Sequence, residues 1–159
     1  MAEQEQATDK QLAISKIYIK DFSFESPQAP TVFKSSDWKP QTNLNLRSSH
    51  TVVEDNIHEV VLTISVEAKE EDKTLFLVEV HQAGLFEIAG YEGEELAAIA
   101  GSFCPNILFP YAREAVAATI QKGGFPEFVL QPINFDALYM QSKQQAAAAQ
   151  AEAGQAETH

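Results

Sequence analysis

The sequence predicts an α+β protein, in which a four-stranded antiparallel sheet carries C-terminal helices packed on one face. Two observations predict this class. Up to residue 82, apolar and polar residues alternate in four successive segments, which is the pattern of half-buried strands, and no helical segment separates them. From residue 91 the apolar spacing changes to three and four residues, which is the period of a helix. Strands followed by helices are typical of the α+β class.

The first strand is expected over residues 14–24, which are rich in β-branched and aromatic side chains. Simple alternation divides these side chains between two faces. One face is predicted to carry Ile17, Ile19, Asp21, Ser23 and Glu25, and the other Tyr18, Lys20, Phe22 and Phe24. The preceding residues 1–11 lack apolar periodicity and are expected to form a flexible leader.

Prolines recur through residues 26–40, so we expect an irregular connection there. Its Val32, Phe33 and Trp38 are too apolar for a solvated loop, and we expect them to pack on the body of the protein. A short second strand is predicted over residues 42–47, where leucines alternate with asparagines.

The third and fourth strands are predicted over residues 57–68 and 74–82, joined as a hairpin by the acidic turn 70–73. Alternation again assigns the faces of the fourth strand. Phe76, Val78 and Val80 share one face, and Leu75, Leu77, Glu79 and His81 share the other.

Helices are predicted from residue 91 onward. Leu96, Ile99, Ala100 and Phe103 have the spacing of one apolar helix face, and glutamates stand at its N-terminal end, where the helix dipole favours them. Because proline fits only the first turn of a helix, the second helix is expected to begin after Pro105 or Pro110. A glycine pair at 123–124 is expected to end it.

Asn134 is expected to cap a last helix, which carries Phe135, Leu138 and Tyr139 on one side. The Ala/Gln-rich residues 143–159 lack anchoring apolar side chains and are expected to form a flexible tail. Residues 12–142 then form one folded domain.

The charge of the chain excludes some classes of partner. Asp and Glu outnumber Lys and Arg by 23 to 11, a net charge of −12, so binding to nucleic acid or to an anionic membrane is disfavoured. Residues 54–95 hold 12 of the acids and only two lysines. This run is either a solvated sheet face or a docking surface for a basic partner, and composition leaves both open.

The motifs of common enzymes are absent from the sequence: it has no Gly-x-Ser-x-Gly, no phosphate-binding glycine loop and no His-x-x-x-His. We therefore expect no enzymatic activity, no cofactor and no metal. The single cysteine, Cys104, excludes an internal disulfide and is expected to be a small buried side chain. His58 and His81 are expected to be structural or surface residues. With no run of 18 apolar residues and a polar start, the chain is expected to be cytoplasmic.

Several aromatic side chains fall in segments predicted to be irregular. They either form a small satellite core or line a groove that holds extended apolar chain segments. These residues are Phe33, Trp38, Phe86, Phe109, Tyr111 and Phe125. An acidic protein-binding adaptor, or an inhibitor that mimics nucleic acid, is the alternative that the charge excess alone would suggest.

Four strings of the sequence resemble the family of the protein-export chaperone SecB. They are IKDFSFESPQAP (19–30), FLVEVHQAGLFEIAG (76–90), CPNILFPYARE (104–114) and GGFPEFVLQPINFDALYM (123–140). The similarity covers about residues 12–142, and the leader, residues 47–58 and the tail carry none of it.

The resemblance implies an ATP-independent cytoplasmic chaperone that holds secretory precursor proteins unfolded and delivers them to the SecA translocation motor. It implies a homotetramer, built as a dimer of dimers, with first strands and helices at the interfaces. It also implies no cofactor, no nucleic-acid partner and no direct insertion into the membrane.

The resemblance further implies roles for particular residues. The site that receives SecA would comprise Asp21, Glu25, Leu77 and Glu79. The client groove would include Trp38, Leu44, Leu46, Phe76 and Tyr111, and tetramer assembly would involve Val78, Val80 and Gln82. Strand alternation independently predicts that Asp21 shares a face with Glu25, and Leu77 with Glu79.

Overall fold

The computed structural model describes residues 9–156, so most of the predicted leader lies outside the described residues. Its strands are β1 (Gln11–Glu25), β2 (Gln41–Glu54), β3 (Ile57–Glu70) and β4 (Lys73–Ala89), which form one antiparallel sheet in the order β1-β4-β3-β2. The 3-10 turn η1 (Thr31–Lys34) lies in the β1–β2 connection. The helices are α1 (Gly93–Ala98), the π-helical segment η2 (Ile99–Phe103), α2 (Cys104–Lys122) and α3 (Phe135–Ala156).

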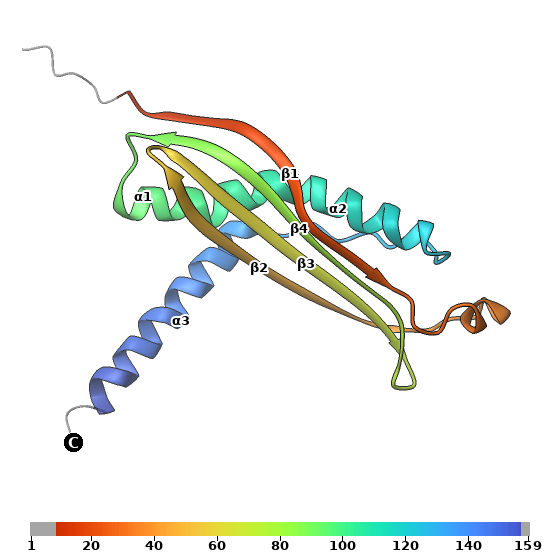
Figure 1. The fold of residues 1–159 in the computed structure, drawn as a ribbon. Helices are drawn as coiled ribbons and strands as arrows, with labels where there is room; N and C mark the ends of the chain where they lie inside the picture. The colour runs from red at the N-terminus through yellow and green to blue at the C-terminus, as the bar shows by residue number, and fades with distance from the viewer. Residues whose placement is uncertain (1–8, 157–159) are drawn as a thin grey trace, which may run out of the picture.

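The predicted α+β class is confirmed. Figure 1 shows α1 and α2 lying end to end along one face of the sheet, while α3 extends away from it. We call the face under these helices the helix face and the opposite one the outer face.

The core lies between the helix face and α2. Inward side chains of β3 and β4, such as Leu62, Ile64 and Phe86, are fully buried. They meet α2 residues spaced four apart, which form a single stripe along the helix: Cys104, Leu108, Ala112, Val116 and Ile120. Burial raises the pKa of the Cys104 thiol to about 12, which agrees with the small core side chain expected from the sequence.

All four strands are longer than predicted, β2 and β4 by the most. β2 continues to Glu54 because the polar residues after Leu46 pair along β3 without needing burial of their own. β4 continues to Ala89 through Gly84. A Cβ at Gly84 would lie 2.7 Å from the Phe86 ring and 3.0 Å from Leu108, so glycine lets α2 approach the sheet closely there.

The side chains of β1 are divided between the two faces differently from the prediction, because the strand has two bulges. The pairing with β4 slips between Ile14 and Lys16 and again between Ile19 and Asp21. Ile19 pairs with Gln82 on the helix face, whereas Asp21 pairs with His81 on the outer face. The prediction that Ile17 and Ile19 share a face with Asp21 is therefore wrong, because an extra residue shifts the alternation by one.

The helical region also differs from the prediction. α1, η2 and α2 follow one another without a break. Of the two predicted starts of the second helix, Pro105 is confirmed in the first turn of α2, whereas Pro110 lies inside the helix. Pro110 and Asn106, whose carbonyl loses its usual hydrogen bond, are both exposed, so water can satisfy that carbonyl. The π-helical segment adds a residue to the turn, which moves Phe103 off the predicted apolar face and leaves it exposed.

The last helix begins as predicted. The Asn134 side-chain oxygen accepts a hydrogen bond from the backbone N–H of Ala137 at 3.0 Å, which is an N-cap. The helix then continues through most of the Ala/Gln-rich segment, to Ala156.

Candidate binding sites on the two faces of the sheet

An aromatic hollow lies at the end of the sheet near the β1–β2 connection. It encloses about 180 Å³ and is lined mainly by apolar side chains, among them Trp38, Phe76, Phe125 and Phe128. The Phe125 ring lies 5.3 Å from Trp38 and 4.9 Å from Phe76, measured between centroids. The Trp38 Nε1–H donates to the Val32 carbonyl at 3.2 Å, which fixes the indole at the rim.

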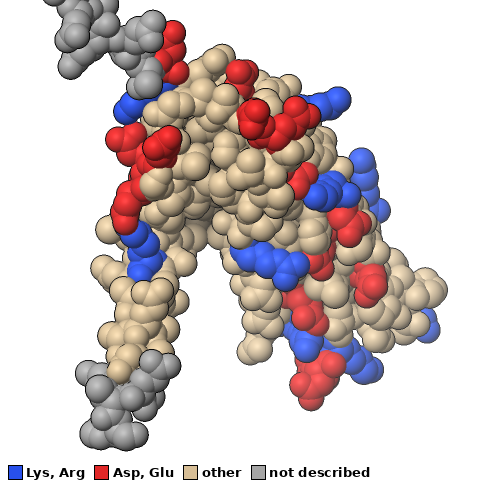
Figure 2. All heavy atoms as spheres, turned by 60° about the vertical axis from the view of Figure 1, so that its left-hand side comes forward, with Lys and Arg blue, Asp and Glu red and all other residues tan. Residues whose placement is uncertain are grey.

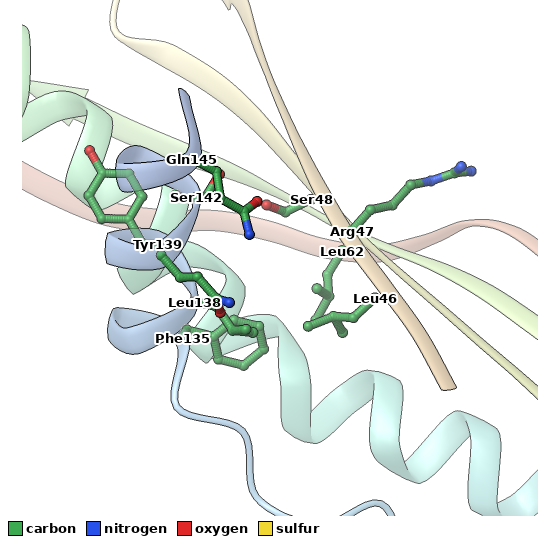
Figure 3. Close-up of a pocket in the computed structure, with 11 residues that line it drawn as sticks. Leu46, Arg47, Ser48, Leu62, Phe135, Leu138, Tyr139, Ser142 and Gln145 are labelled. Carbon is green, nitrogen blue, oxygen red and sulfur yellow. The ribbon is translucent and has the colours of Figure 1, made fainter. Parts of the chain in front are cut away.

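A second and larger hollow, of about 520 Å³, lies between β2 and α3; we call it the α3–β2 cleft. Figure 3 shows Leu46 and Leu62 of the sheet facing Phe135 and Leu138 of the helix across this space. Figure 2 shows α3 standing apart from the rest of the molecule, with the hollow between them.

Contacts at the start of α3 set the width of this cleft. Gly101 of η2 is so close to the helix that a Cβ there would lie 2.7 Å from the Tyr139 ring. The hydroxyl of the buried Ser102 donates to the Asp136 carboxylate, and Lys143 forms an ion pair with Glu94 of α1. These contacts hold the first three turns of α3 against η2 and α1, so the apolar side of the helix faces β2.

Strand β2 connects the two hollows along the helix face. Thr42 lines the aromatic hollow and Leu46 lines the cleft. Leu44, between them on the same face, is 47% exposed. An extended chain that follows β2 could therefore contact both hollows, because alternate side chains of a strand repeat about every 7 Å.

Most of the predicted groove residues are brought together by this arrangement. Trp38 and Phe76 line the aromatic hollow, although Phe76 is only 5% exposed and also belongs to the core. Leu46 lines the cleft and Leu44 lies between the two. Tyr111 is on the surface of α2, half exposed, and lines neither hollow.

The outer face carries the predicted SecA-binding residues. Asp21 pairs with His81, Ser23 with Glu79, and Glu25 with Leu77, and paired residues of antiparallel strands share a face. Three successive cross-strand rows of β1 and β4 therefore hold all four predicted residues. The prediction that Asp21 shares a face with Glu25, and Leu77 with Glu79, is confirmed.

Strand pairing brings two more residues to this part of the outer face, neither of which the sequence analysis singled out. Glu67 of β3 pairs with Leu77, so it extends the acidic row. Arg47 of β2 pairs with Thr63, which pairs with His81, so this cation lies in the same row as Asp21. Alternation along β3 puts Glu67 on the polar side of its strand, but no signal in one sequence gives the register between strands.

Glu79 is the most contacted of the predicted acidic residues. Its Oε1 lies 3.0 Å from Nε2 of His81 and 3.7 Å from Nη2 of Arg47. Thr63 Oγ1 lies 3.4 Å from Nδ1 of His81, on the other side of the imidazole ring. Because a carboxylate only accepts hydrogen bonds, the Nε2–H of His81 donates to Glu79.

A separate polar cluster lies further along the outer face. Tyr18 donates its hydroxyl proton to Glu59, and the Lys20 ammonium lies 2.8 Å from the other oxygen of that carboxylate. The hydrogen bond from Lys20 is the main cause that lowers the pKa of Glu59. Burial, helped by the bond to Glu59, raises the pKa of Tyr18 to about 12.

The residues predicted for assembly are buried within the chain. Val78 and Val80 are fully buried on the helix face, and the Gln82 amide donates to the Tyr18 carbonyl of β1 at 3.2 Å. Beside them, edge strand β1 exposes three large apolar side chains on the helix face, Ile14, Ile19 and Phe22. Any effect of Val78, Val80 and Gln82 on assembly must therefore pass through the elements packed against them, which are β1, β3 and α2.

Within residues 9–156, no three His, Cys, Asp or Glu side chains gather as a metal site. No helix in this part of the chain is long and apolar enough to span a membrane. On one face the molecule has an open aromatic hollow and a cleft of mixed apolar and polar lining, and on the other face it has a charged surface. Together these features define a protein that binds other polypeptides.

Comparison with known proteins identifies the family. Residues 4–146 match the family model described as preprotein translocase subunit SecB. The protein-export protein SecB of Nitrosococcus oceani is 54% identical over 142 residues, which cover 89% of this chain and 87% of the relative. That of Marinobacter nauticus is 47% identical over 166 residues, covering the whole of both chains. The chain belongs to the SecB family, and its role is that of a protein-export chaperone.

A solved structure supports the fold. The SecB-like chaperone of Mycobacterium tuberculosis, in complex with a peptide from the HigA1 antitoxin, superposes with a TM-score of 0.64. The match covers 77% of this chain and 90% of the other, at 18% sequence identity.

Proposed function

We propose that this chaperone holds unfolded secretory precursors along β2, with apolar segments in the aromatic hollow and the α3–β2 cleft, and without ATP. The observation that carries the proposal is a pair of open hollows, each with apolar side chains in its lining, joined by an exposed strand. The SecB-like structure bound to a peptide supports binding of polypeptide segments by this fold.

The energetics favour weak individual sites. A segment that buries ~400 Å² of apolar surface would gain ~10 kcal/mol at about 25 cal/mol per Å². Much of this gain is lost in ordering the segment and in the entropy of association. Stable holding then requires several segments of one client to bind at once, which favours an assembly of several chains.

For this reason the proposal includes a homotetramer, a dimer of dimers in the cytoplasm. Its support in the structure is β1, an edge strand that exposes Ile14, Ile19 and Phe22 on the helix face. Exposed apolar side chains on an edge strand favour pairing with another chain. The proposed chaperone unit is residues 12–142, and α3 continues beyond it to Ala156.

Delivery to the SecA motor would use the outer face. Asp21, Glu25 and Glu79 would attract a basic segment of SecA, and Leu77 would provide an apolar contact. A nucleic-acid-mimicking inhibitor is less well supported, because cations such as Lys20, Arg47 and Lys69 pair with outer-face carboxylates and interrupt any continuous row of negative charge.

Light scattering of a reduced, unfolded substrate tests client holding. We expect the protein to suppress aggregation without ATP, and replacement of Leu46 by Asp to reduce this suppression. A variant with Thr51→Asp, on the outer side of the same strand, is the matched control and should act like the wild type. Equal loss in both variants, or equally strong binding of a client in its folded form, would refute groove binding.

Delivery is tested separately by measuring binding to purified SecA. Glu79→Lys should abolish SecA binding and leave the suppression of aggregation intact. Loss of both activities together would indicate a folding defect instead of a docking role for Glu79.

A further inference from the structure

Arg47 is a basic side chain placed beside the central carboxylate of the outer face. Its Nη2 lies 3.7 Å from Oε1 of Glu79, although the two residues come from strands that are not neighbours in the sheet. Figure 3 shows Arg47 pointing away from the α3–β2 cleft, which agrees with its place on the outer face. Arg47 also lines the cleft, but its guanidinium lies beside Glu79 on the outer face, away from the apolar side chains of Leu46 and Leu138.

The surface around this pair is concave and polar. Asn45, Arg47, Thr63, Ser65 and Glu79 line a hollow of about 340 Å³ on the outer face. The Arg47 side chain is 73% exposed at its edge, and Glu79 is half buried. Arg47 therefore already lies beside the Glu79 carboxylate when a cation of a partner approaches it through this hollow.

We propose that Arg47 is an internal counter-ion that competes with the basic partner for Glu79 and so sets the affinity of the outer face. The inference rests on the proposed docking of a basic segment at Glu79. Its physical reason is that one carboxylate oxygen already shared by His81 and Arg47 attracts a further cation less strongly than a free carboxylate does.

The pair is suited to competition because it is weak. Exposed ion pairs contribute little, since water and salt screen them and two side chains must be ordered. A partner can therefore displace Arg47, and the cost of doing so appears as a modest reduction in affinity. Removing the cation should strengthen binding about two- to fivefold.

Binding of a synthetic lysine-rich peptide with a central leucine, measured by calorimetry at low and at physiological salt, tests this competition. The wild type, Arg47→Gln, Arg47→Lys and Lys10→Gln are compared. Lys10 is the matched control because it also forms an exposed ion pair, with Glu95 at 3.1 Å, and its loss changes the net charge equally. Glu95 follows β4 and lies in α1, outside the outer-face rows.

We expect Arg47→Gln to bind the peptide about two- to fivefold more tightly, and Arg47→Lys and Lys10→Gln to match the wild type within about a factor of 1.5. Equal gains in Arg47→Gln and Lys10→Gln would overturn the inference, because net charge alone would explain them. No gain in Arg47→Gln, or no binding of the peptide to either protein, would overturn it as well.

The same four proteins are then titrated with purified SecA. Failure of SecA to bind the wild type would refute the proposed docking, whereas the peptide result would still decide the role of Arg47. A gain for SecA in Arg47→Gln, matching the gain for the peptide, would show that the competition acts on the natural partner.

Discussion

The position of α3, and with it the width of the α3–β2 cleft, depends on the absence of a side chain at Gly101. A Cβ at this position would lie 2.7 and 2.9 Å from two carbon atoms of the Tyr139 ring. Ordinary contact between carbon atoms requires at least about 3.4 Å, so the ring must move by roughly 0.5–0.7 Å, and α3 with it. We predict that Gly101→Ala costs about 1–3 kcal/mol of stability, which is the usual cost of overpacking, and weakens client binding several-fold.

Urea unfolding followed by circular dichroism, together with the light-scattering assay, measures both effects. Gly154→Ala, near the end of α3, is the matched control, because a Cβ there would meet open space. That substitution should leave client holding unchanged and slightly stabilise the helix, since alanine is the better helix former. If Gly101→Ala were as stable as the wild type and held clients equally well, the docking of α3 on η2 would not determine the shape of the cleft.

Four further predictions concern single groups. Replacing Leu46 by Ala should weaken client binding with little change in stability, because the side chain is only half buried; a fall in stability as large as the fall in affinity would contradict this. The pKa of Glu59 is lowered chiefly by the hydrogen bond from Lys20 and then by that from Tyr18, so its stabilising effect is present above pH 4.5 and is lost as the pH falls through its folded-state pKa. Tyr18→Phe removes one of these bonds and should reduce the loss of stability seen in acid unfolding curves. The pKa of His58 is lowered first by burial and then by the charge of its neighbour His50, so its contribution to the free energy of unfolding is complete above pH 6.5 and is lost as the pH falls below that value. His58→Phe should remove this dependence of the unfolding free energy on pH, as urea unfolding at several pH values would show. Cys104, with a pKa raised to about 12, should resist alkylation at pH 8 in the folded protein and react after unfolding, as mass spectrometry would show.

The sequence predicted the class of fold and the order of the elements because alternation and helical spacing are local signals. The faces of β4 were correct from Phe76 to His81, where no bulge interrupts the strand. They were wrong at Leu75, because the pairing with β3 slips there and Leu75 joins Phe76 in the core and in the aromatic hollow. The faces of β1 were only partly correct, because nothing in a single sequence marks the extra residue between Ile19 and Asp21.

The candidate sites were harder to predict, because they depend on pairing between distant segments. The α3–β2 cleft joins Leu46 to Phe135 and Leu138, and no local pattern connects residues so far apart in the chain. For the same reason Arg47 and Glu79 could not be paired beforehand: their contact depends on the register of β2, β3 and β4 together. Tyr111 lies exposed on the surface of α2 and lines neither hollow, so its role in client binding stays a prediction.

The central claim is that unfolded chains bind on the helix face, in the two hollows along β2. Methyl NMR of the protein, titrated with a permanently unfolded client, would test it most directly. We expect the largest shifts at Leu44, Leu46 and Leu138, and small ones at Leu77 on the opposite face. Shifts concentrated at Leu77, with Leu46 and Leu138 unchanged, would contradict the account.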